Sequence, residues 1–156
     1  DIVTTAAGRD WRPIVFAQQE PRRGIPRFDA TSSPGPEQYW VTGVVTDIDR
    51  DGRLDVVGVE WEPSLPTRIW RNEGDVGNWL AVSAPPGASV QVTADDEPVA
   101  GGQAGTSTGY AAGPDSFVWL GLGTRTEVDV AVTHPDGRST SLEGVQADQH
   151  LALCER

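Results

Sequence analysis

Apolar and polar residues alternate along this chain in short runs that are separated by Gly, Pro and Asp. Alternation with a period of two is typical of half-buried β-strands, and no long stretch follows the 3.6-residue period of a helix with caps. We therefore predict an all-β protein. The predicted strands are Ile2–Thr5, Ile14–Ala17, Val41–Thr46, Asp55–Val59, Thr67–Arg71, Trp79–Val82, Ser89–Thr93, Phe117–Leu120, Glu127–Thr133, Ser139–Leu142 and His150–Leu153.

Turn residues define the connections between several of these strands. Pro135-Asp-Gly137 is a hairpin signal, and Asp95-Asp-Glu97 is expected at another hairpin tip. The segment Ala100–Gly109 is rich in Gly, Ser and Thr, so we predict a long loop there.

A faint internal repeat has an offset of 54 residues. Asp1-Ile-Val matches Asp55-Val-Val, and Phe16 matches Trp70. A period of about fifty residues suits the four-stranded blades of a β-propeller. About one and a half blades would fit in residues 1–74. The chain, which contains no Met, is therefore expected to be the C-terminal piece of a larger protein.

The composition changes near the middle of the chain. Residues 40–74 are rich in charge and Trp, whereas residues 83–115 are rich in Gly, Ala, Ser and Thr. We place the boundary within Glu73–Asn78. The predicted domains are propeller repeats over 1–74 and a small β domain over 78–156.

The net charge of −11 narrows the classes of partner. Such an acidic protein repels phosphate backbones and attracts cations, so nucleic acid is not expected as a partner. All twelve basic residues are Arg, which excludes Schiff-base lysines and the Walker lysine. No apolar run approaches the length of a membrane span, and no signal peptide is visible.

The strongest chemical signal is the loop Asp47–Asp55. Four Asp residues occupy positions 1, 3, 5 and 9, Gly52 at position 6 lets the chain reverse, and position 7 offers a carbonyl oxygen. Without a cation these carboxylates would repel each other. The predicted Ca²⁺ ligands are Asp47, Asp49, Asp51, Asp55 and the carbonyl oxygen of Arg53.

This loop is not an EF-hand, because position 12 is Gly58 and the bidentate Glu is missing. The sequences on both sides, Trp40–Thr46 and Val56–Trp61, are strand-like. We therefore expect a calcium-pinned hairpin, whose role is structural more than catalytic.

The segment Gly43–Val57, followed by Arg68-Ile-Trp-Arg-Asn-Glu-Gly74, resembles an FG-GAP/VCBS repeat. This resemblance implies a calcium-binding blade of an integrin-like β-propeller, with the same five ligands.

The second half carries three features in a characteristic order: Gly109-Tyr110, Trp119-Leu-Gly-Leu-Gly123 and the segment His134–Val145. This order resembles the ASPIC/UnbV domain, over about Asn78 to Leu153. The resemblance implies terminal propeller blades followed by a small C-terminal domain of β-sandwich or barrel-like form.

Other residues give weaker signals. Leu120-Gly-Leu-Gly lacks the third glycine of a nucleotide loop, so we expect a strand-end turn. His134 and His150 are expected at surface or edge positions, because no nucleophile elbow accompanies them. Tyr110 and Cys154 are expected to pack as core residues, and Trp61 lies in a loop that could expose it to a ligand.

Three functions remain open. The first is a calcium-stabilised binding or interaction module whose partners are the remaining propeller blades and a protein or small molecule. The alternative is an enzyme or accessory protein of bacterial natural-product assembly, of the enediyne polyketide type, that binds a hydrophobic ligand. The Lys-free, Arg-rich composition resembles that of actinobacteria and agrees with this alternative. The third is a structural cap that closes an open propeller edge.

No catalytic constellation is visible, so we favour a non-enzymatic role. The first function implies a secreted or cell-surface protein, and the biosynthetic alternative implies a cytoplasmic one.

Overall fold

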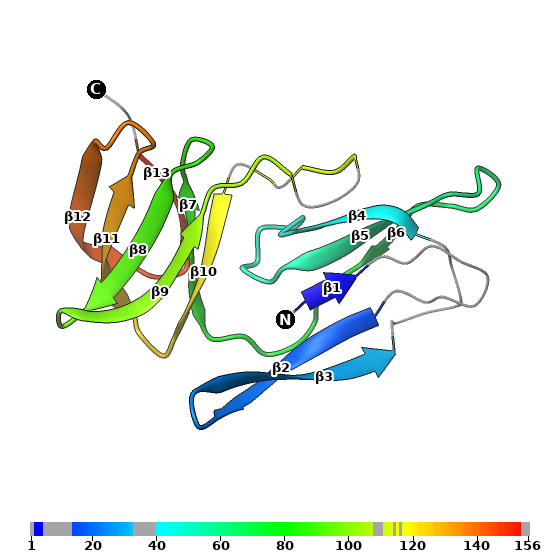
Figure 1. Ribbon diagram of the computed structural model, residues 1–156, viewed down its shortest axis with the longest axis horizontal. Coiled ribbons are helices and arrows are strands. Elements are labelled where there is room, and N and C mark those ends of the chain that lie inside the picture. Colours follow the sequence, from blue (N-terminus) through cyan, green and yellow to red (C-terminus); the bar gives the residue numbers. More distant parts are fainter. Residues whose placement is uncertain are drawn as a thin grey trace.

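The computed structural model describes residues 2–4, 14–32, 40–107, 111–113, 115 and 117–153. Within these ranges the regular structure consists of β-strands in four sheets, and no helix is present (Figure 1). The predicted all-β class is confirmed. It follows that no helix in the described ranges could cross a membrane.

The N-terminal sheet has the order β1-β2-β3 and is antiparallel. Its strands are β1 (Ile2–Thr4), β2 (Ile14–Arg22) and β3 (Ile25–Ser32). The sequence did not predict β3, and it ended β2 at Ala17. Residues 20–30 are all exposed, so this part of the hairpin has no buried face to impose an alternating pattern. Pro21 and Pro26 further weaken the strand signal.

The second sheet has the order β4-β5-β6 and is also antiparallel. It consists of β4 (Trp40–Thr46), β5 (Asp55–Glu60) and β6 (Arg68–Trp70). Trp40 is 3% exposed and packs on Trp70 with ring centroids 4.3 Å apart. A Cβ at Gly58 would overlap the Trp40 ring, so glycine is required beneath it. The aspartate loop connects β4 to β5.

The strand pairing of these two sheets repeats at the offset seen in the sequence. Ile2 pairs with Phe16 in β1 and β2, and 54 residues later Val56 pairs with Trp70 in β5 and β6. The remaining partners of the two ladders follow the same offset. Strand β3 has no such counterpart in the second sheet, because the corresponding residues enter the C-terminal domain as β7.

The C-terminal domain is a sandwich of two sheets, with orders β10-β7-β13 and β12-β11-β8-β9. Strand β13 pairs with β7 in parallel, and the other pairs in this domain are antiparallel. The strands are β7 (Asn78–Ser83), β8 (Ser89–Ala94), β9 (Glu97–Gln103), β10 (Phe117–Gly123), β11 (Glu127–Thr133), β12 (Ser139–Gln146) and β13 (Gln149–Ala152).

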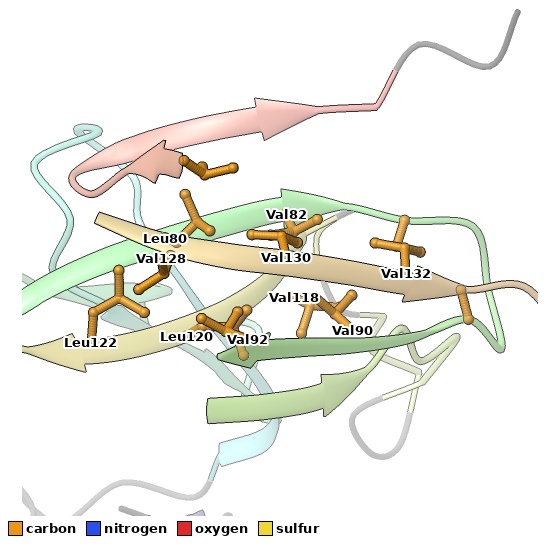
Figure 2. Packing of buried hydrophobic residues seen from close by; sticks show 13 residues of the cluster. Leu80, Val82, Val90, Val92, Val118, Leu120, Leu122, Val128, Val130 and Val132 are labelled. Carbon is orange, nitrogen blue, oxygen red and sulfur yellow. The ribbon is translucent and has the colours of Figure 1, made fainter. Parts of the chain in front are cut away.

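The hydrophobic core lies between these two sheets (Figure 2). Alternate residues point inward, as in Val128, Val130 and Val132 of β11, which are 0–2% exposed. The buried cluster comprises Leu80, Val82, Ala84, Ala88, Val90, Val92, Val118, Leu120, Leu122, Val128, Val130, Val132 and Val145.

The two predicted hairpin turns are present. Pro135–Gly137 joins β11 to β12, with the His134 amide donating to the Arg138 carbonyl at 2.8 Å. Asp95 and Asp96 join β8 to β9 with φ angles of 52° and 64°, the left-handed values of a tight hairpin turn.

Two predictions in this domain were wrong. Residues 100–103 are the end of β9 and not a loop, because Gly102 lets the strand approach β10 closely. A Cβ there would lie 2.7 Å from Cγ1 of Val118. Leu120–Gly123 continues strand β10 and is not a strand-end turn. Several residues with predicted roles, namely Asp1, Gly109, Tyr110 and Cys154, lie outside the described residues.

Candidate metal centre

The loop between β4 and β5 gathers three carboxylates. Asp47, Asp49 and Asp55 each offer one oxygen, and these oxygens all lie within 4.8 Å of one another. Asp47 and Asp55 are 9% and 2% exposed, whereas Asp49 lies at the surface. A group of three converging carboxylates, two of them buried, could hold a metal ion.

Hydrogen bonds from the backbone fix the two buried carboxylates. Asp47 accepts from the amides of Asp51 at 3.1 Å and Gly52 at 2.8 Å, which folds the loop back on its first residue. Asp55 accepts from the amides of Ile48 at 3.1 Å and Asn72 at 2.8 Å. Each carboxylate oxygen has two lone pairs, so these bonds leave acceptor capacity for an ion.

Asp51, the fourth predicted carboxylate ligand, has different partners. Its Oδ2 pairs with the guanidinium of Arg53 and lies 3.6 Å from Nη2 of Arg71. Desolvation raises the pKa of Asp51, but the amide of Arg53 and the charges of both arginines outweigh it, so the net pKa is lowered. Asp51 thus stays ionised, although it is outside the group of converging oxygens.

The charge and spacing of the loop suit a divalent cation. Arg71 also pairs with Asp49 at 2.7 Å, so two guanidiniums face four carboxylates and two negative charges remain. Oxygens that share one Ca²⁺ at about 2.3–2.6 Å can lie at most about 5 Å apart. The three converging carboxylates meet that limit, and their all-oxygen donor set suits Ca²⁺ or Mg²⁺.

The loop also contacts the C-terminal domain. Gly52 has a φ of +86°, and a Cβ there would overlap the indole of Trp79 in β7. Beside it, the Thr46 hydroxyl donates to Oδ2 of Asp115 at 2.7 Å. Asp115 in turn accepts from the Phe117 amide and from Nε1 of Trp119. The loop is therefore packed directly against the outer face of sheet β10-β7-β13.

A cleft of about 720 Å³ lies next to this contact. Val45, Val56 and Trp70 of the second sheet lie on one side, and Trp79 and Trp119 of the C-terminal domain lie on the other. The residues that pair across β4, β5 and β6 share a sheet face, which explains why these three side chains line the cleft together.

Aromatic rings cover the rest of this outer sheet face. His150 of β13 lies edge-on to Phe117, Trp79 and Trp119, with centroid distances of 5.0 to 5.3 Å. The predicted edge position of His150 is correct, but its aromatic neighbours were not foreseen. His134 lies at the β11–β12 hairpin, and Trp61 is 58% exposed in a loop as expected.

The sequence analysis did not single out Trp79, Trp119 or Asp115 for this interface. A signal existed for the tryptophans, because both precede a core leucine (Leu80 or Leu120) and strand alternation must turn them to the opposite face. Asp115 follows a Gly-rich segment and carried no signal of its own.

Comparison with known families identifies the C-terminal half. The family model described as ASPIC and UnbV matches residues 77–156. A search of curated proteins gives no match. The matched residues span the sandwich domain. They include Trp79, which lies against Gly52 of the aspartate loop, Asp115, which accepts from Thr46, and Trp119, which donates to Asp115. On this match, which covers half of its length, the chain belongs to the ASPIC and UnbV family.

Proposed function

We propose that this protein is a calcium-stabilised binding module in which an FG-GAP/VCBS-type blade is joined to the ASPIC/UnbV domain. The observation that carries the proposal is the convergence of Asp47, Asp49 and Asp55 in a loop that packs on the C-terminal sheet. A Ca²⁺ ion bound there would offset the remaining negative charge. It would hold the loop in the shape that contacts Trp79.

The repeated strand register supports the blade assignment. Two successive ladders with the same pairing, 54 residues apart, are what consecutive repeats of one structural unit produce. The carbonyl of Arg53 and the carboxylate of Asp51 complete the proposed ligand set, with Asp51 turning from its arginine partners toward the ion.

Further blades are the first proposed partner. The face of sheet β4-β5-β6 that points away from the cleft carries Val57 and Ile69, and Ile69 is 61% exposed. Large apolar side chains on an open sheet face favour packing against another element. Secretion or display at the cell surface agrees with this proposal, since extracellular modules bind Ca²⁺ at about 10⁻⁴ to 10⁻³ M.

Thermal unfolding with and without calcium tests the proposal. We expect millimolar CaCl₂ to raise the melting temperature, EDTA to lower it, and added Ca²⁺ to restore it. Parallel titration with MgCl₂ separates calcium preference from a general effect of divalent charge.

A matched pair of variants makes the test specific. Asp49→Asn removes an exposed ligand and should abolish the calcium response, whereas Asp96→Asn removes the same charge at the distant β8–β9 turn and should keep it. A melting temperature that does not respond to Ca²⁺, or an equal response in both variants, would refute the proposal.

A further inference from the structure

The cleft beside the aspartate loop is built from two apolar faces that approach each other without closing. One wall is the outer face of sheet β10-β7-β13, with Trp79, Trp119 and Gly121, and the other contains Val56 and Trp70. Apolar walls around solvent are unfavourable, and a molecule that displaces the water gains free energy. A volume of about 720 Å³ lies in the range of small-molecule sites, about 300–1,000 Å³.

The shape of the C-terminal wall favours a flat ligand. The rings of Trp79 and Trp119 have centroids 5.5 Å apart and are inclined by 32°, so they lean against each other and form one aromatic cluster at the wall of the cleft. Gly121 lies beside them, and a Cβ built on it would meet no atom within 4 Å. The absence of a side chain at this position leaves the surface open, and planar rings stack well on indoles.

The charges around the cleft favour a neutral ligand. None of the described residues that line it is a carboxylate, so a cationic ligand would have no carboxylate in direct contact with it. Arg71 is at the wall, but its guanidinium pairs with Asp49 at 2.7 Å, so an anionic ligand would have to compete for it. Asn72 and Asn78 offer neutral polar groups.

We propose that this cleft binds a neutral, planar, largely apolar small molecule that contains fused rings and stacks on Trp79 and Trp119. Gly52 and Leu54 of the aspartate loop belong to the wall. An effect of calcium on the wall formed by the loop depends on the proposed calcium function. The proposal that the cleft binds a ligand does not depend on it.

Nile red, a neutral planar dye whose emission rises in apolar surroundings, is a suitable probe. We expect saturable binding to the full chain, measured by fluorescence titration in both CaCl₂ and EDTA. Gly121→Leu places a side chain into the open space and should weaken binding at least about tenfold, which corresponds to roughly 1.4 kcal/mol. Ser141→Leu adds the same side chain on the exposed strand β12 and should leave binding unchanged.

Val76→Gln provides a second variant, because Val76 lines the cleft but is 50% exposed and its substitution should not affect folding. It should weaken dye binding several-fold. Absence of saturable binding in both buffers, or equal affinity of the wild type and Gly121→Leu, would overturn the proposal. The melting response to calcium is measured separately, so a failure of the calcium proposal and a failure of the cleft proposal are distinguishable.

Discussion

The hydroxyl of Thr46 donates a 2.7 Å hydrogen bond to Asp115, a residue 69 positions later in the chain. Thr46 ends strand β4 directly before the first loop aspartate, and Asp115 precedes strand β10 of the sandwich. The same Oδ2 also accepts from Nε1 of Trp119 at 2.9 Å. One carboxylate thus joins sheet β4-β5-β6 to an aromatic wall of the cleft.

Thr46→Val should loosen this junction. The substitution keeps the shape of the side chain but removes the donor, and we expect a loss of about 1 kcal/mol in the free energy of unfolding. Urea denaturation followed by tryptophan fluorescence measures the change. Thr67→Val, at an exposed position before β6, serves as the control. Equal midpoints for the two variants would show that the hydrogen bond contributes nothing to stability.

Asp55→Asn should destabilise the protein even in EDTA. Asp55 is 2% exposed and uses both oxygens to accept backbone amides, whereas an Asn side chain has one acceptor oxygen. Leaving one buried amide unpaired costs about 1–3 kcal/mol. Asp49→Asn weakens a surface pair with Arg71, and the free energy of unfolding should fall by less than about 1 kcal/mol.

Melting curves of the two aspartate variants in EDTA check this difference. Both variants should also lose the response to calcium. If Asp49→Asn destabilised the metal-free protein as much as Asp55→Asn, the structural role assigned to Asp55 would be wrong.

Gly52→Ala should be costly for two reasons. Its φ of +86° disfavours any side chain, and a Cβ would overlap the indole of Trp79. Gly137→Ala is the matched control, because Gly137 has a φ of +87° with no atom near its Cβ position. We expect Gly137→Ala to lower the free energy of unfolding by about 1 kcal/mol, and Gly52→Ala to lower it by clearly more.

A double-mutant cycle with Trp79→Ala separates the two reasons. Without the indole, the loss of unfolding free energy caused by Gly52→Ala should be smaller by more than about 0.5 kcal/mol. The loss that remains is due to the positive φ of the backbone. The free energies of unfolding come from urea titrations. Additive effects of the two substitutions would contradict the contact between Gly52 and Trp79.

The sequence was sufficient for the elements that bury one face and for the aspartate loop. Strand β11 matched its predicted bounds, Glu127–Thr133, because Val128, Val130 and Val132 alternate cleanly with outward residues. The loop could be predicted because the spacing of its aspartates along the chain, and not its tertiary surroundings, brings Asp47 and Asp49 together. The different position of the Asp51 carboxylate could not be predicted, because its pairing with Arg53 and Arg71 does not follow from the spacing of the aspartates.

Strands without a buried face, and a strand in which a glycine permits a close contact, could not be predicted from the sequence. Strand β3 is exposed along its described side chains, and Gly102 in β9 is explained only by its contact with Val118. The cleft could not be predicted either. The alternation in β7 and β10 shows that Trp79 and Trp119 point away from the core, but it does not show which residues lie opposite them.

The parallel pairing of β13 with β7 also determines the order in which the sandwich can form. The Trp79 amide donates a hydrogen bond to the side chain of Asp148, 69 residues later, and Gln149 of β13 pairs with Leu80 of β7. Contacts so distant in sequence form slowly and late. During synthesis, sheet β10-β7-β13 must remain incomplete until β13 has left the ribosome. A nascent chain without β13 would expose an unpaired edge of β7, and it would be prone to associate with other nascent chains.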